Sequence, residues 1–457
     1  MIGAQQVVDL VLDAAARLDG AVETIVLVTD RGEASLRWAG NSMTTNGVSV
    51  NRSTTVVSIV RQGDSAHVGS LESCDVDPAA LPALVAASQA AARSAPAARD
   101  AFTLLTGSST PADWDAPVPG TGAEVFAPVA GALAQGFRGP DMLYGFAHHV
   151  VATTFLATSA GIRRRYTQPS GSVEINAKRD GASAWAGVST PWFAEVQADQ
   201  LLADLSTRLG WASRTVDLPA GRYETIMPPS TVSDMMIYLY WSMDGRGAQE
   251  GRTALSAPGG GTRVGEKLTD LGLTLYSDPV AAGLECEPFQ AVGSSSETSS
   301  VFDNGLDIGR VDWIRDGVIN ALAYPRATAR EFDAPVAVPT SNLLMTGGSA
   351  ALADMVAATE RGLLLTTLWY IREVDPTTLL LTGLTRDGVY LVEDGRVTGA
   401  VNNFRFNESP LDLLRRATEA GVSEVTLPRE WGDWFNRAQM PTLRIPDFHM
   451  SSVSQAQ

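Results

Sequence analysis

The chain has 457 residues, of which 45% are hydrophobic and 19% are charged, and its formal net charge is −17 at pH 7. This composition is typical of a folded globular protein, and the length predicts two or three domains instead of a single hydrophobic core. The negative charge argues against a nucleic-acid partner, because binding to a phosphate backbone depends on basic patches.

The two cysteines, Cys74 and Cys286, are too few for a disulfide scaffold and favour a reducing compartment. The N-terminal segment lacks the basic residues that open a signal peptide, and its apolar residues recur at helical spacing. No apolar run approaches the roughly 18 to 20 residues that span a membrane. We therefore expect a cytoplasmic protein with no membrane partner.

The first predicted domain comprises residues 1–100 and combines helices with strands. After an N-terminal helix, strands are predicted at 22–28, 33–38, 48–51 and 55–61, with turns at 30–32 and 62–64. A second helix is predicted at 79–93, because the proline before it is tolerated in the first turn of a helix. This pattern is typical of an α+β unit whose helices pack on one face of a sheet.

The second predicted domain comprises residues 101–218 and is a meander of strands. Residues 94–121 are rich in Ala, Pro, Ser and Gly and predict a connecting loop, which a helix at 124–137 follows. Strands are then predicted at 142–157, 162–166, 172–177 and 182–188, with hairpin turns at 159–161, 169–171 and 179–181. A helix at 193–209 ends this half of the chain.

The most informative stretch follows at residues 220–252. A strand is predicted at 223–227, and two prolines end it. Thr231, with an aspartate three residues later, has the spacing of a capping box and predicts a helix that ends near Gly245. This helix is apolar or aromatic on nearly every side, so we expect it to lie inside the fold.

Three features of this stretch are distinctive: the run G-R-Y-E-T-I-M-P-P-S, the apolar helix behind it, and the pattern G-R-x-x-x-E-G-R that follows. Together they resemble the TldD/PmbA family. In the TldD branch of that family the helix carries H-E-x-x-x-H, in which two histidines bind zinc and the glutamate activates water. The corresponding positions here are Ile237, Tyr238 and Ser242, and none of them can bind zinc or act as a base at pH 7.

A further ligand in the family is a cysteine shortly before a C-terminal P-T-L-x-[IV] strand. Residues 441–445 match that strand, but residues 425–440 contain no cysteine. The chain therefore resembles the TldE/PmbA branch, which lacks the metal and pairs with TldD. The resemblance implies an α+β fold with mixed and antiparallel sheets and packed helices, in which a two-lobed N-terminal half precedes a TldD/PmbA-type domain at 219–457.

Several further elements are predicted within this last domain. Residues 257–262 form a Gly-rich loop that lacks the G-K-[ST] ending of a phosphate loop, so they predict a surface turn. The later elements are a strand at 271–279, hairpins at 313–319 and 390–397 with Asp-Gly turns, a helix at 411–421 and a last strand at 442–445.

Histidine and cysteine offer no convincing catalytic or metal site. The four histidines are His67, His148, His149 and His449. None has a neighbour at ligand spacing, and two adjacent residues of a strand point to opposite faces, so we expect satisfied or surface imidazoles. Cys286 lies between Glu285 and Glu287, whose charges would raise the pKa of the thiol and suppress the thiolate. The sequence thus predicts no catalytic and no metal-binding residue in this chain.

Six residues remain as candidates for a cleft or an interface. They are Tyr238, Trp241, Ser242, Arg246, Glu250 and Arg252. The first three lie on similar faces of the predicted helix, where aromatic residues either belong to the core or line a cavity shared with a partner. The last three form a charged cluster, which is either a solvated ion network or a contact for a partner or a peptide terminus. Both pairs of alternatives stay open at this point.

The resemblance implies that the chain is the metal-free subunit of a TldD/TldE-like zinc metallopeptidase heterodimer. A TldD-like partner would supply zinc, water and the general base, and this chain would shape the cavity and bind small or unfolded peptides. The alternatives are an autonomous enzyme that tailors or cleaves a peptide-derived metabolite, and a scaffold or chaperone for a peptide. Co-purification with a TldD-like protein would separate the first hypothesis from the others.

Overall fold

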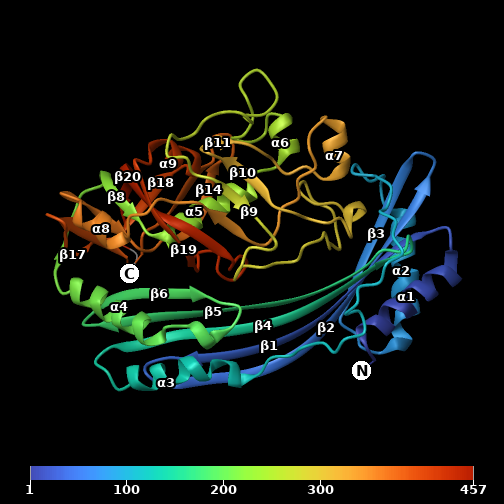
Figure 1. Ribbon diagram of the computed structural model, residues 1–457, viewed down its shortest axis with the longest axis horizontal. Helices are drawn as coiled ribbons and strands as arrows, with labels where there is room; N and C mark the ends of the chain where they lie inside the picture. Colours follow the sequence, from blue (N-terminus) through green and yellow to red (C-terminus); the bar gives the residue numbers. More distant parts are fainter. Residues whose placement is uncertain (1, 387, 456–457) are drawn as a thin grey trace.

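The computed structural model describes residues 2–386 and 388–455, which form two halves (Figure 1). The N-terminal half, residues 2–218, contains one long, curved sheet. The C-terminal half, which comprises the described residues from 219 onward, lies over one face of this sheet. We call that face the inner face and the opposite one the outer face.

The N-terminal sheet is an antiparallel meander of long strands. They are β1 (Glu23–Trp38), β2 (Met43–Gln62), β3 (Ser65–Ser73), β4 (Met142–Thr158), β5 (Arg163–Arg179) and β6 (Ala182–Ser189). Their order is β3-β2-β1-β4-β5-β6, and all neighbours are antiparallel. Strands from residues 1–100 and from 101–218 therefore share one sheet, and the boundary predicted at residue 100 separates strands that pair with each other.

Two predicted turns, at 30–32 and 169–171, are wrong because they lie inside β1 and β5. In β1 the polar residues have cross-strand partners, because Arg52 of β2 donates to both carboxylate oxygens of Asp30, at 2.5 and 2.7 Å. In β5 the glycine permits close packing instead of a turn, because a Cβ at Gly171 would lie 2.9 Å from the ring of Phe193. Long strands consequently replace pairs of short predicted ones in β1, β2 and β5.

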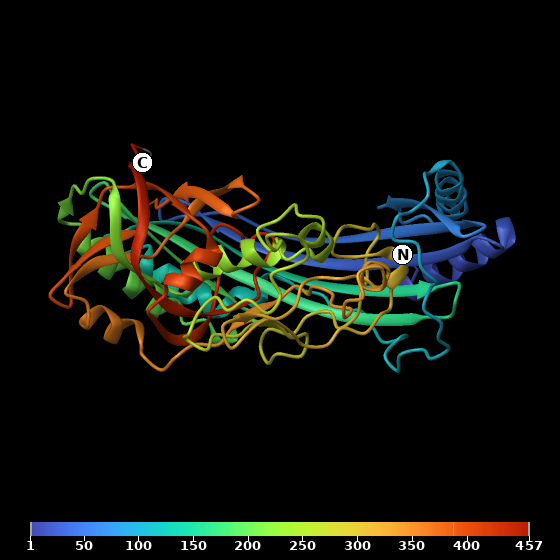
Figure 2. The ribbon, with the colours of Figure 1, turned by 90° about the horizontal axis from the view of Figure 1, so that it is seen from above.

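Four helices cover the outer face. They are α1 (Ala4–Asp19), α2 (Leu81–Ser94), α3 (Ala127–Gly136) and α4 (Ala198–Trp211). Because successive residues of a strand point to opposite faces, Val26 and Val28 of β1 share a core with α1 and α2. Val173 and Ile175 of β5 share another with α3 and α4. Seen from above, α1 and α2 lie at one end of the molecule, beyond most of the C-terminal half (Figure 2).

The inner face has two ends of different character. At the packed end, Ile25, Leu27, Val57, Ile59 and Leu156 form a core with Phe289, Val301 and Phe302 of the C-terminal half. At the open end, the face carries Arg31, Glu33, Arg37, Phe146 and His148, which line a cleft of about 570 Å³. The two halves therefore share an apolar core at the packed end and border a cleft at the open end.

The C-terminal half contains a second, mixed sheet. Its strands in the described chain, together with the short β7 that precedes residue 219, are β7 (Thr215–Val216), β8 (Gly221–Met227), β9 (Leu275–Ser277), β10 (Val311–Arg315), β11 (Val318–Ile319), β12 (Leu343–Met345), β13 (Arg361–Leu365), β14 (Trp369–Asp375), β15 (Leu380–Leu384), β16 (Val389–Glu393), β17 (Arg396–Val401), β18 (Phe404–Glu408), β19 (Glu419–Thr426) and β20 (Ala438–Val453). The main path is β11-β10-β9-β12-β20-β8-β13-β16-β17-β7, and the other four strands attach beside it.

Five short helices accompany this sheet in the described residues. They are α5 (Pro229–Trp241), α6 (Gly245–Gln249), α7 (Arg326–Glu331), α8 (Leu352–Ala357) and α9 (Pro410–Arg416). Within the described residues, no helix combines the length and the apolar character that crossing a membrane would require. The helix predicted at 411–421 is too long, because residues 419–426 pair with β20 as β19.

The two Asp-Gly hairpins are confirmed. Asp316 and Gly317 connect β10 to β11, and Asp394 and Gly395 connect β16 to β17. All four residues have φ between 49° and 79°, as the type I′ turn of a two-residue hairpin requires. The last strand, predicted at 442–445, extends over the whole of β20.

The buried helix is confirmed as α5, but it begins before the predicted capping box. Pro228 is the N-cap residue, and the hydroxyl of Thr231 donates to the backbone oxygens of Pro228 and Leu365 instead of capping the helix. Asp234 accepts a hydrogen bond from the backbone N–H of Glu430 at 3.0 Å. Thr231 and Asp234, the residues of the predicted capping box, therefore bind neighbouring segments of the chain. The helix ends at Trp241, earlier than predicted.

Candidate functional site

The three positions at which the TldD branch carries its zinc motif have different surroundings on α5. Ile237 is fully buried in the apolar core of the C-terminal half. Tyr238 is half-buried, and the loss of water raises the pKa of its phenol. Ser242 is the C-cap residue, and its hydroxyl donates to the backbone oxygen of Tyr238 at 2.9 Å. Hydrocarbon, phenol and hydroxyl groups do not match the Cys, His, Asp and Glu ligands of zinc.

The histidines are not arranged as a metal site. Within residues 2–386 and 388–455, no three His, Cys, Asp or Glu side chains lie close enough together to hold a metal ion. His149 is buried on the outer face, 2.6 Å from the hydroxyl of Thr121 and 2.9 Å from the carbonyl oxygen of Pro191. His148 lies on the inner face, 3.6 Å from Glu33. The two neighbours therefore point to opposite faces, as strand geometry predicts.

Cys286 is buried between the halves, and burial is the main cause that raises the pKa of its thiol. The predicted direction is thus confirmed, but the predicted cause, repulsion by Glu285 and Glu287, is wrong. Glu287 is itself removed from water, and this burial raises the pKa of its carboxyl group to about 8. A carboxyl group that holds its proton exerts little repulsion on a thiolate.

Residues 427–437 form a loop, which we call the aromatic loop, that packs against α5. Trp431 contacts Trp241 and Tyr238 of α5, with ring centroids 5.0 and 5.7 Å apart. Its indole N–H donates to the backbone oxygen of Asp234 at 2.8 Å. Phe435 packs against Tyr240, with a centroid distance of 5.9 Å. The stretch that lacks the family's cysteine therefore does lie beside the helix, and it brings aromatic rings instead of a ligand.

Two carboxyl groups fix this loop in place. Asp234 is fully buried at the start of α5, and burial raises the pKa of its carboxyl group well above the ordinary range. Glu430 accepts hydrogen bonds from the backbone N–H groups of Tyr370 at 2.8 Å and Ile371 at 3.0 Å. Because Asp234 in turn binds the N–H of Glu430, α5, the aromatic loop and the start of β14 are held as one unit. Sequence reasoning missed both roles, since each depends on contacts between distant segments.

Part of this aromatic cluster faces solvent. Trp241 and Trp434 are 43% and 73% exposed, and Tyr370, whose backbone N–H donates to Glu430 of the loop, is 55% exposed. Large aromatic side chains with this exposure are a common feature of binding surfaces when they occur together. Tyr238 is the more buried edge of the cluster and Trp241 its exposed edge, and the role of Trp241 in a cavity shared with a partner stays a prediction.

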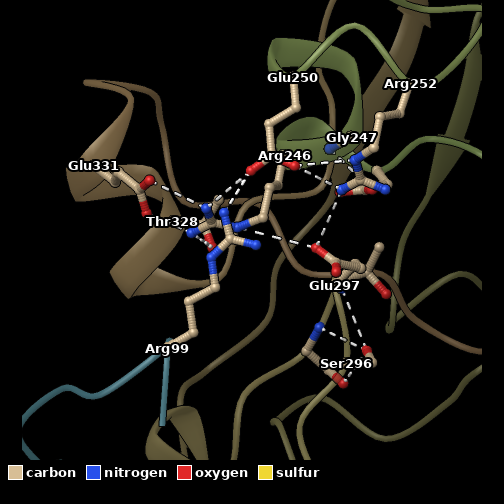
Figure 3. A network of polar contacts seen from close by, with 12 residues as sticks. Arg99, Arg246, Gly247, Glu250, Arg252, Ser296, Glu297, Thr328 and Glu331 are labelled. Atoms are coloured by element: carbon tan, nitrogen blue, oxygen red, sulfur yellow. Dashed lines mark hydrogen bonds and ion pairs between the residues drawn. The ribbon is translucent and has the colours of Figure 1, made fainter. Parts of the chain in front are cut away.

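Arg246, Glu250 and Arg252 belong to a network of ion pairs around α6 and α7 (Figure 3). The side chain of Arg246 is only 4% exposed and contacts both carboxylate oxygens of Glu331, one of them at 3.1 Å, as well as Glu250 at 3.5 Å. The side chain of Arg252 is 49% exposed and pairs with Glu250 at 2.9 Å. The guanidinium of Arg246 is thus enclosed by α6 and α7, whereas Arg252 is solvent-exposed, and its contact with a partner or a peptide stays a prediction.

This network also joins the two halves of the molecule. Arg99, from the loop between α2 and α3, donates to the carboxylate of Glu250 at 2.5 Å (Figure 3). Close by in sequence, the backbone oxygen of Thr103 accepts from Arg326 at 3.0 Å, and Arg326 also pairs with the buried Asp303 at 2.7 Å. The charged cluster thus lies at a joint between segments far apart in the chain.

Comparison with known proteins identifies relatives of this fold. Residues 220–452, slightly more than half of the chain, match the family described as the PmbA/TldA metallopeptidase C-terminal domain. The crystal structure of TldE from Thermococcus kodakarensis superimposes with a TM-score of 0.77 at 13% identity and covers 97% of this chain and 99% of that one. No curated protein matches the chain.

Two further solved structures superimpose equally well. Both are proposed modulators of DNA gyrase, one from Thermotoga maritima and one from Bacteroides thetaiotaomicron. The first has a TM-score of 0.76 at 14% identity, with coverage of 97% and 99% of the two chains. The second has a TM-score of 0.75 at 14% identity, with coverage of 98% of each. The predicted α+β class is confirmed, and with the family match over residues 220–452 it follows that the chain belongs to the TldD/PmbA family.

Proposed function

We propose that this chain is the metal-free subunit of a TldD/TldE-like zinc metallopeptidase, paired with a TldD-like chain that supplies zinc, the activated water and the general base. The observation that carries the proposal is the composition of α5 and its surroundings. Ile237, Tyr238 and Ser242 occupy the motif positions, and the aromatic loop packs where the family's cysteine would reside. A complete metal site is thereby replaced by packed aromatic rings.

The role that these residues support is peptide binding in a cavity shared with the partner. Trp241, Trp434 and Tyr370 offer broad aromatic surfaces, which contact many kinds of side chain without requiring one sequence. The loop that carries Trp434 is fixed through Glu430, so its surface is preorganised and binding costs little ordering entropy. We place the pair in the cytoplasm, where the unpaired Cys74 and Cys286 would stay reduced.

The test is to purify this chain alone, a TldD-like chain from the same organism alone, and the two together after co-expression. We expect the chains to co-purify, and we expect unstructured peptides to be cut only by the pair. A zinc chelator should abolish the cutting, because activated water requires the metal. Trp241→Ala should slow peptide cleavage by the pair, and Trp192→Ala, which changes a tryptophan of similar exposure outside the cluster, should not.

Cleavage by this chain alone that resists chelation and survives repurification would overturn the proposal in favour of an autonomous enzyme. Binding of peptides without cleavage by either the chain or the mixture would instead indicate a scaffold or chaperone. About one zinc per isolated chain would also contradict the proposal.

A further inference from the structure

The inner face of β5 carries a polar stripe that ends in a small, partly open cavity between the two halves. Tyr166, Gln168 and Ser170 of β5 line one wall, and Asn436 and Arg437 at the end of the aromatic loop line the other. The cavity has a volume of about 40 Å³. Because one water needs roughly 10 to 15 Å³ by this measure, the space holds about three waters or one carboxylate group.

Arg437 brings a positive charge to this cavity and forms no ion pair with the residues that the structure describes. Its guanidinium donates one hydrogen bond, to the carbonyl oxygen of Pro169 at 3.1 Å. Within the described residues, no carboxylate lies within 4.0 Å of it, and the loss of water lowers the pKa of the side chain. A desolvated cation without a partner is costly, so this arrangement favours an anion that enters the cavity.

Two neighbouring groups complete a set of donors and acceptors. The hydroxyl of Tyr166 makes no hydrogen bond with the described chain, and burial raises its pKa to about 12, so it remains a proton donor. The amide of Gln168 donates to the carbonyl oxygens of Pro169 at 3.0 Å and Glu285 at 3.1 Å, but its Oε1 is buried without a partner. The cavity therefore presents two donors for an anion, the guanidinium of Arg437 and the hydroxyl of Tyr166.

The cavity opens toward the larger cleft at the open end of the inner face. Ser170, Gly171, Asn436 and Arg437 line both spaces. The cleft has a volume of about 570 Å³, which lies in the usual range for ligand-binding clefts, and Trp434 and Phe146 contribute aromatic surface to it. An extended chain that lies in the cleft can therefore place its end in the cavity.

We propose that the cavity binds the C-terminal carboxylate of a peptide, with the carboxylate at Arg437 and Tyr166 and the preceding residues in the adjoining cleft. The shared chemistry is a peptide carboxylate, which an aspartate or glutamate side chain could also supply. Glu285 contributes its backbone oxygen to the surroundings of Gln168, and its side chain is exposed. This inference rests on the peptide-binding part of the proposed function, but its test needs neither zinc nor the partner subunit.

The experiment is calorimetric titration of the full chain with acetyl-trialanine as the free acid and as the amide. We expect the acid to bind roughly tenfold or more tightly than the amide, because charge-assisted hydrogen bonds are lost in the amide. Arg437→Gln should remove the difference between the two peptides. Arg138→Gln, which changes an exposed arginine remote from the cavity, should leave it intact.

A second variant keeps the test informative if Arg437→Gln does not fold. Tyr166→Phe removes only a hydroxyl and conserves volume, and we expect it to weaken binding of the acid severalfold with little effect on the amide. Equal affinity for acid and amide, or no binding of the acid, would overturn the inference. Equal binding of acetyl-Ala-Asp-Ala-amide would overturn the assignment to the C-terminus. Peptide cleavage by the co-expressed pair reports separately on the proposed function.

Discussion

The packed end and the open end of the inner face belong to the same strands, yet they meet the C-terminal half in different ways. At the packed end, β1 presents Ile25 and Leu27, which share a dry core with Phe302. Farther along the same strand, Arg31 and Arg37 take the corresponding positions and line a cleft. Strand alternation therefore fixes which side chains face the other half, and their chemistry determines whether water stays between the halves.

The charges at the open end explain why the cleft stays open. Glu33 interacts with Arg31 and lies 3.6 Å from His148, and the guanidinium of Arg37 lies 4.4 Å from the ring centre of Phe146. Closing the halves over these groups would remove their water, and the desolvation penalty can exceed the gain from pairing. The open end is thus available to a ligand, and the packed end serves to hold the halves together.

The largest expected difference between the two ends is in the cost of losing a phenylalanine. Phe302→Ala at the packed end should lower the free energy of unfolding by about 3 to 5 kcal/mol, because it leaves a cavity in a closed core. Phe146→Ala at the open end should cost about 1 kcal/mol, since Phe146 is only partly buried. Urea denaturation of both variants measures the difference. Equal losses would remove the distinction between the ends.

A smaller effect is expected in the ion network beside the packed end. Arg246→Met should lower the free energy of unfolding by about 2 kcal/mol, because an enclosed guanidinium loses charge-assisted hydrogen bonds. Arg252→Met should cost about 0 to 1 kcal/mol, as exposed ion pairs do. The midpoints of thermal unfolding report both, and a larger loss for Arg252→Met would show that exposure does not govern the network.

A further prediction concerns pH and the carboxyl group of Glu287, which lies close to Tyr166. Its folded-state pKa of about 8 exceeds the ordinary value of 4.5, so the folded state binds the proton more tightly than the unfolded state. This contribution to stability is full below the unfolded pKa and is lost as the pH rises through about 8. Wild-type thermal stability should therefore decline more between about pH 6 and pH 9 than that of Glu287→Gln.

Glu285→Gln, which changes an exposed neighbour, is the matched control and should keep the wild-type decline. Identical pH profiles for Glu287→Gln and the wild type would show that Glu287 is as hydrated in the folded chain as in the unfolded one.

Short sequence patterns correctly predicted the elements whose conformation depends on interactions between residues close together in the chain. The Asp-Gly hairpins and the buried helix α5 are examples, since turn geometry and apolar composition are properties of short segments. The long strands were missed because residues 30–32 resemble a turn until Arg52 and the strand β4 are placed beside them. Register and pairing between segments more than 100 residues apart leave little trace in any short stretch.

The residues of the candidate site also fall into two groups, those that a short sequence pattern indicates and those that only the folded structure brings together. Tyr238 and Trp241 were proposed as candidates because their helix has a recognisable pattern, and Ile237 stands at a position where the TldD branch carries a zinc ligand. Arg437 and Tyr166 were not found, because each is unremarkable until folding brings them to one cavity. The two tryptophans in W-G-D-W-F at 431–435 were a signal that could have drawn attention to the aromatic loop.

During synthesis, the N-terminal sheet is complete once β6 has left the ribosome, but its packed end still lacks a cover. Phe289, the first of its three covering residues, follows the end of β6 by about 100 residues, which takes roughly 5 to 20 seconds at ordinary rates of translation. Over that interval Ile25, Ile59 and Leu156 form an apolar patch exposed to other nascent chains. A chaperone that recognises apolar strands would therefore bind the packed end. It would not bind the open end, because the polar side chains there are hydrated.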